Sequence, residues 1–173
     1  MVFKKINAVI ALLAALTLAT HTSINARMMM LGRVYDSPVS LAYILMSLVG
    51  LHVVISICML IKHEGKTAKY SGLYKGTMWQ RISAIAVIPL VLFHAFIRVG
   101  TLGFGLIAIL VVHFFVMILA FSHIAISVPN ALVTLGVIDT TSKHKKVRTV
   151  CIVISILLFI LGLSASISEV IAL

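Results

Sequence analysis

Four histidines that lie inside long apolar stretches are the residues of this sequence best suited to chemistry. They are His21, His52, His94 and His123, and each lies in a different stretch. Ionisable side chains are costly in hydrocarbon, so a histidine at such depth is a candidate functional residue. A neutral imidazole is also a common ligand of metal ions and of haem iron. What these rings can do depends on which of them the surrounding segments bring together.

The composition indicates a membrane protein built from helices. The chain has 173 residues, of which 62% are hydrophobic and 10% charged. Continuous apolar runs of about 20 residues indicate helices that cross a bilayer, whereas a barrel would show alternation. We expect an all-α integral membrane protein, a single membrane domain over residues 1–173 that forms a five-transmembrane-helix bundle with haem sites in its core. The predicted spans are residues 6–24, 38–61, 78–99, 106–128 and 150–168.

The basic residues predict the orientation of the bundle. The formal net charge is +10, and most of the charge lies in loops at one side of the predicted spans. By the positive-inside rule this side is cytoplasmic, so we expect a cytoplasmic N-terminus and a multi-pass protein of the cell inner (cytoplasmic) membrane. Such loops would meet anionic membrane lipid or an acidic partner, and no nucleic acid is expected. The basic residues on this side are Lys4, Lys5, Lys62, Lys66, Lys69, Lys75, Arg81, Lys143, Lys145, Lys146 and Arg148, against Arg27, Arg33 and Arg98 on the other.

The predicted depths of the four histidines in the membrane form two matching pairs. With a rise of about 1.5 Å per residue, His21 and His94 fall in the outer half of the membrane, and His52 and His123 in the cytoplasmic half. Two imidazoles at matched depth on facing helices can ligate a haem iron from both sides. Two such pairs would stack two haems and make an electron path across the membrane. Each histidine could instead only hydrogen-bond a neighbouring helix, but four on four spans favour haem.

Other polar residues near the spans are interpreted from their position. Haem propionates need polar or cationic contacts, and the candidates are Arg81, Ser83 and Arg98. His113 precedes His123 by ten residues, about 80° around the helix, and has no partner at its predicted depth. We interpret His113 as a packing residue or a neighbour of a quinone. Pro129-Asn130 is expected to interrupt the apolar pattern of the fourth span, with residues 131–138 continuing as a short or bent piece at the interface. The histidines in basic loops, His63 and His144, are interpreted as surface residues.

Three sequence features together resemble a known family. The first is the apolar span with His52 followed by a polar loop, and the second is Gln80-Arg81-Ile82-Ser83 at the start of the span with His94. The third is His123 followed at a fixed distance by Val133-Thr134-Leu135-Gly136. In this order, and over most of the chain, they resemble the dihaem cytochrome b membrane anchor of succinate:quinone oxidoreductases and quinol:fumarate reductases.

The resemblance implies two haem b groups and a place in electron transport. One haem would be ligated by His52 and His123 near the cytoplasmic face, and the other by His21 and His94 near the outer face. A flavoprotein subunit with FAD and an iron–sulfur subunit would dock on the basic cytoplasmic loops and carry out the dicarboxylate chemistry, so the chain itself would transfer electrons and bind quinone. The polar residues available to a quinone near the outer haem are Asp36, Arg98 and Glu169.

Two other functions stay open from the sequence. The chain could be a haem-free membrane anchor whose histidines only bridge helices, or the anchor of a different quinone-linked oxidoreductase. A small transporter is disfavoured because it would be expected to place carboxylates within the spans. The four acidic residues of the chain all lie at or near span ends: Asp36, Glu64, Asp139 and Glu169.

Overall fold

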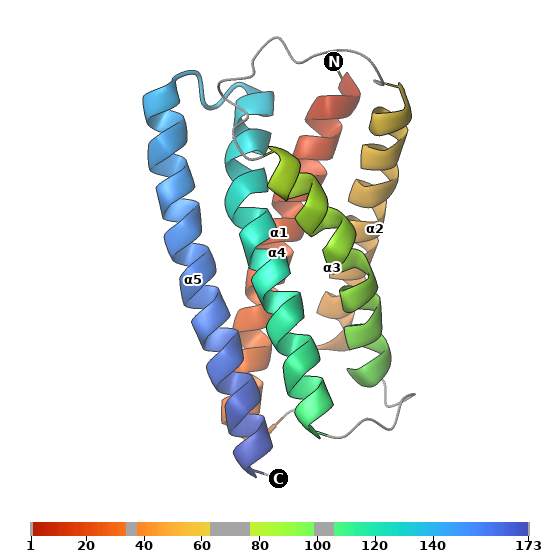
Figure 1. Ribbon diagram of the computed structural model, residues 1–173, viewed down its shortest axis with the longest axis vertical. Coiled ribbons are helices and arrows are strands. Elements are labelled where there is room, and N and C mark those ends of the chain that lie inside the picture. Colours follow the sequence, from red (N-terminus) through yellow and green to blue (C-terminus); the bar gives the residue numbers. More distant parts are fainter. Residues whose placement is uncertain (1, 34–37, 63–76, 99–105, 173) are drawn as a thin grey trace.

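Five long helices form a bundle with the chain ends at opposite ends of it (Figure 1). The computed structural model describes residues 2–33, 38–62, 77–98 and 106–172, and these ranges contain helix and no strand. Each helix is long and apolar enough to cross a membrane, which confirms the all-α, five-span prediction. The helices are α1 Val2–Met30, α2 Val39–Lys62, α3 Thr77–Arg98, α4 Leu106–Leu135 and α5 Thr141–Ala172.

Two helix boundaries differ from the prediction for physical reasons. The predicted fifth span starts near residue 150, whereas α5 begins at Thr141 and includes the basic run before that span. Lysine and arginine are good helix formers and can carry a helix past the apolar core into the headgroup region. The predicted continuation beyond Pro129-Asn130 is present, but without the expected interruption, since α4 runs as one helix through Pro129 to Leu135. Pro129 is fully buried, and in membrane helices neighbouring groups can satisfy the backbone that a proline frees.

Glycines end two of the helices. Gly32 has a φ of 67° and Gly136 a φ of 83°, a left-handed conformation that glycine adopts without steric cost. At the end of α4, the amide of Gly136 donates to the carbonyl of Val133 and the amide of Val137 to the carbonyl of Leu132, both at 3.0 Å. This Schellman motif satisfies carbonyls that the helix leaves unpaired. The Val133-Thr134-Leu135-Gly136 feature is therefore a helix end.

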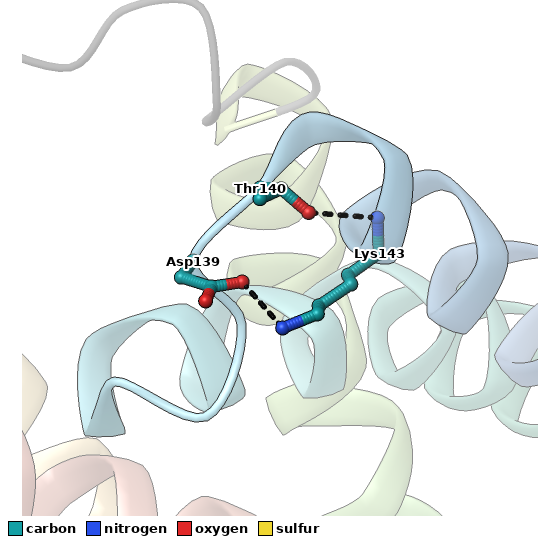
Figure 2. A network of polar contacts seen from close by, with 3 residues as sticks. All are labelled: Asp139, Thr140 and Lys143. Carbon is teal, nitrogen blue, oxygen red and sulfur yellow. Dashed lines mark hydrogen bonds and ion pairs between the residues drawn. The ribbon is translucent and has the colours of Figure 1, made fainter.

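The turn between α4 and α5 is held by two side chains that cap α5 (Figure 2). The hydroxyl of Thr140 accepts a hydrogen bond from the amide of Lys143 at 3.3 Å, which makes Thr140 the N-cap residue. The ammonium of Lys143 lies 2.8 Å from the carboxylate of Asp139. This hydrogen bond from Lys143 is the main cause of a pKa of Asp139 below its ordinary value. Both side chains are exposed, so the ion pair contributes little stability.

The helices that carry the predicted histidine pairs are not packed directly on each other. Among the described residues, α1 packs on α2, α4 and α5, and α4 also packs on α3 and α5. No Cα atom of α2 comes within 8 Å of α3 or α4, and none of α1 comes within 8 Å of α3. Closely packed helices have axes 8–10 Å apart, with many Cα atoms inside that limit. His52 and His123 therefore project from helices that are set further apart than a close-packed pair.

Large apolar side chains cover the outside of the bundle. Exposed examples occur on all five helices and include Leu16, Val54, Ile85, Ile107 and Leu157. A monomeric soluble protein rarely exposes a continuous apolar surface of this kind. The surface therefore agrees with the length and composition of the helices in indicating a protein surrounded by lipid.

Candidate functional site

His123 of α4 is held in one orientation and one tautomer by the start of α3. Its Nδ1 lies 3.0 Å from the main-chain carbonyl oxygen of Gln80 and 3.2 Å from the hydroxyl of Ser83. A carbonyl oxygen can only accept a hydrogen bond, so Nδ1 carries the proton and Nε2 keeps its lone pair. A metal-ligating histidine usually has this arrangement, because the second hydrogen bond fixes the ring and raises its basicity. In His123 the nitrogen that keeps a lone pair is therefore Nε2.

The Gln80-Arg81-Ile82-Ser83 feature provides this support. The side chain of Ser83 is fully buried, and its hydroxyl donates to the carbonyl of Gln80 at 3.1 Å. The Ser83 oxygen is then available to accept from the protonated Nδ1 of His123, which shares its hydrogen between two oxygens. Ser83 is expected to contact a haem propionate, whereas in the structure its hydroxyl contacts His123. The propionate contact stays a prediction. Arg81, the other candidate in this feature, is exposed.

A chain of hydrogen bonds connects this support to α5. The side-chain oxygen of Gln80 accepts a hydrogen bond from the side-chain amide of Asn130 at 2.9 Å. The side-chain oxygen of Asn130 lies 3.3 Å from Nε2 of His144. His144 is only 8% exposed, so its interpretation as a surface residue is wrong. The cause is helical geometry: the flanking lysines are exposed, but one face of the first turn of α5 rests on α4. A buried network in which each polar group has a hydrogen-bond partner fixes the positions of its residues.

His52 of α2 lies next to α1 and close to His123. Its ring is near the main chain of Asn7, and the side-chain amide of Asn7 donates to the hydroxyl of Ser56 at 3.1 Å, one turn from His52. The Nδ1 atom of His52 is buried and has no hydrogen-bond partner among the described residues. His52 and His123 are close enough for their charges to interact. The two residues of the predicted inner pair are thus within electrostatic range of each other, and their joint ligation of a haem stays a prediction.

The predicted outer pair has other neighbours in the structure. Nε2 of His21 lies 2.8 Å from the amide nitrogen of Asn25, one turn further along α1. The ring of His94 lies against that of His113, with centroids 4.6 Å apart and planes inclined by 52°. Nδ1 of His113 in turn lies 3.2 Å from the hydroxyl of Ser166 in α5. The expectation that His113 has no histidine at its depth is wrong, and the pairing of His21 with His94 stays a prediction.

The remaining candidate residues fall into two groups. The predicted quinone contacts Asp36, Arg98 and Glu169, and also His63, lie outside the part of the chain whose side chains the structure describes. Within the described ranges, no group of three or more histidine, cysteine, aspartate or glutamate side chains could hold a bare metal ion. Two imidazoles alone are an incomplete set for a bare ion, but they are the full protein contribution to a bis-histidine haem.

Comparison with known proteins finds no relative of this chain. No protein-family model, no curated protein and no solved structure matches it. What the chain does must therefore follow from its own residues.

Proposed function

We propose that the chain is a membrane-embedded cytochrome b subunit that binds haem between His52 and His123 and passes electrons between a membrane quinone and partner subunits. The observation that carries this proposal is the state of His123. Its Nδ1 proton is committed to the Gln80 carbonyl, and its Nε2 lone pair is left for a ligand. His52 is within electrostatic range of His123, on a helix that does not pack on α4.

The residues at this site fit a bis-histidine haem. The buried, unpartnered Nδ1 of His52 shows a ring that the protein groups described here do not fully satisfy. Leaving a buried polar atom unpaired costs about 1–3 kcal/mol, and a ligand bound at this Nδ1 atom would remove that cost. A bound haem would supply reversible one-electron transfer. The chain's own residues would fix its position: Gln80 and Ser83 orient His123, and Asn130 holds Gln80.

The wider proposal follows the sequence features. A second haem b would be held by His21 and His94, with Asp36, Arg98 and Glu169 near a quinone. The N-terminus would face the cytoplasm in the inner membrane. The basic residues at that end of the bundle would receive the iron–sulfur and flavoprotein subunits of a succinate dehydrogenase or fumarate reductase complex. The exposed lysines of the first turns of α1 and α5 lie at one end of the bundle, which supports a docking surface there (Figure 1).

The test is the haem content of the full chain purified from membranes, with the absorption and electron paramagnetic resonance spectra of each haem. The wild type should carry two low-spin bis-histidine haems, and H52A and H123A should each lose the same one. H113A is the matched control, because it removes a buried histidine from the same helix as His123 and should leave the inner haem unchanged.

Two results would contradict the proposal. If the purified chain is colourless after haem-replete expression, the histidines only bridge helices and the chain is a haem-free anchor. If H52A and H123A keep both haems with unchanged spectra, these residues are not ligands. The haem-free alternative predicts contacts of histidines with neighbouring side chains, such as His94 with His113 and His21 with Asn25. The haem content of the purified chain therefore decides between the two functions.

A further inference from the structure

A groove on the outside of the bundle runs between α4 and α5. Its volume is about 360 Å³, and it is open to the surroundings. The walls are mainly apolar and include Phe121 and Ile126 of α4 and Ile152 and Phe159 of α5, with two serines, Ser122 and Ser155, also in the lining. Arg148 is the one charged residue in the lining, and it lies at the end of the groove nearest the start of α5. The groove is thus an apolar channel with a cation at one end.

The length of the groove matches one leaflet of a bilayer. From Arg148 to Phe159 the α5 wall rises by about 16 Å, at about 1.5 Å per residue. The hydrocarbon core of a bilayer is about 30 Å thick, so the groove covers roughly half of it. α5 begins at the end of the bundle where α1 begins (Figure 1), and Arg148 lies two turns into α5, just before the predicted apolar span of residues 150–168, where lipid headgroups are expected. The dimensions therefore suit an acyl chain that enters from the headgroup region and ends near the midplane.

The charge at the end of the groove favours an anion. Arg148 is half-buried, and Lys145 lies one turn before it on the same side of α5. Asp139 is the one acidic side chain in the described part of the chain, and its carboxylate pairs with Lys143. A guanidinium with no described carboxylate is suited to the two oxygens of a phosphate. Basic pockets between membrane helices at the headgroup level are known to bind anionic lipid.

A second groove between the same two helices provides a comparison. It has a similar volume of about 340 Å³ and lies in the other half of the bundle. Its lining is entirely apolar: Leu110, Val111, Phe114, Phe115, Leu163 and Ile167. An apolar groove alone is therefore an ordinary feature of this surface, since any lipid chain can fill it. What distinguishes the first groove is Arg148.

We propose that the groove headed by Arg148 binds an anionic phospholipid, with one acyl chain between α4 and α5 and the phosphate on the Arg148 guanidinium. The site is separate from the histidine pair and does not depend on the proposed electron transfer. A quinone tail would bring no negative charge to Arg148. A second copy of this chain would bring few carboxylates, because the sequence has 4 acidic residues against 14 lysines and arginines.

The test is lipid binding to the detergent-purified full chain, measured by native mass spectrometry with phosphatidylglycerol and phosphatidylcholine. The wild type should prefer phosphatidylglycerol by about 10-fold, and R148Q should reduce that preference to near unity. K146Q is the matched control, since it removes the same charge from an exposed position two residues away that does not line the groove. R148K should keep part of the preference, because it keeps the charge but loses the two-pronged hydrogen bond.

A second variant tests the acyl chain independently of charge. S122F should fill the groove and weaken binding of both lipids while Arg148 stays in place; the Ser122 hydroxyl bonds only within α4, to the carbonyl of Leu119 at 3.0 Å. Helix content and thermal unfolding would establish that each variant is folded. Equal losses in R148Q and K146Q would overturn the proposal, since they indicate general surface attraction. Wild-type binding by S122F, or a wild type without preference, would also overturn it.

Discussion

The carbonyl oxygen of Gln80, in the first turn of α3, lies 3.0 Å from Nδ1 of His123 in α4. These two residues are separated by 43 positions in the sequence, and their hydrogen bond joins the two helices at the candidate site. It also decides the chemistry of the ring, because the nitrogen that faces the carbonyl must carry the proton. The other nitrogen is then the one that can bind iron. The main-chain carbonyl of Gln80 thus determines which nitrogen of His123 keeps a lone pair for a ligand.

Removal of the Ser83 hydroxyl should loosen His123 without removing a ligand. In S83A the contact at 3.2 Å is lost, while the Gln80 carbonyl stays in place. Groups that orient a ligating histidine commonly change metal affinity by about 10–100-fold, and we expect an effect near the lower end. The measurement is haem retention of the purified chain against a competing apoprotein, with the spectrum of the haem that remains.

S47A is the control for that experiment. Ser47 is an exposed serine of α2 whose hydroxyl bonds within its own helix, to the carbonyl of Tyr43 at 2.8 Å. It should retain haem as the wild type does. If S83A also retains haem as the wild type does, the contact with Ser83 has no part in holding His123 for the iron.

Substitution of Asn130 should destabilise the bundle. N130A would leave the Gln80 side-chain oxygen and Nε2 of His144 without their described partners in a buried place. An unsatisfied buried polar group costs about 1–3 kcal/mol, so we expect a loss in that range in the free energy of unfolding. Thermal and denaturant unfolding in mild detergent would measure it.

The same network predicts non-additive effects. H144A should cost less when Asn130 is already absent, because the two side chains share one hydrogen bond. The control is T134A, since the Thr134 hydroxyl bonds only within α4, to the carbonyl of Asn130 at 2.9 Å. Additive losses in the double variant N130A/H144A would show that the two residues act independently.

Much of the fold could be predicted because apolar length is a local property of the sequence. Each predicted span lies within one of the five helices or overlaps it. The matched depth of His52 and His123 stays a prediction. Depth needs only the number of residues from a span end. Which face of a helix meets which neighbour is not local, and there the prediction was poorer.

His144 and His113 show what could not be predicted. The charge of the surrounding lysines hides the fact that His144 lies on the buried face of its helix, against an asparagine 14 residues away. His113 meets His94 because α3 packs on α4, and which residues of two packed helices meet depends on side-chain packing along the whole interface. By contrast, the Val133-Thr134-Leu135-Gly136 feature could have been interpreted as a helix end from Gly136 alone.

The ion pair at the start of α5 predicts a small pH dependence. The folded-state pKa of Asp139 is lowered, mainly by the hydrogen bond from Lys143, relative to an ordinary value of 3.8. Its contribution to stability is therefore present above that value and is lost as the pH falls below it through the folded-state pKa. In D139N the unfolding temperature should change less across this acidic range than in the wild type. Identical pH profiles would show that the ion pair does not persist in solution.

The close approach of α5 to its neighbours at Gly162 predicts a steric effect. A Cβ atom on Gly162 would lie 2.5 Å from the sulfur of Met117 in α4 and 3.4 Å from a methyl group of Thr22 in α1. The end of a methionine side chain can move, so G162A should be tolerated, whereas G162L should force α5 outward. Overpacking of this kind costs about 1–3 kcal/mol, and the unfolding temperature should fall accordingly. The control is G50A in α2, because nothing lies within 4 Å of a Cβ atom added to Gly50. Its higher helix propensity alone should raise the free energy of unfolding by up to about 1 kcal/mol. If G162L unfolds at the wild-type temperature, α5 does not lie against α1 and α4 at this point.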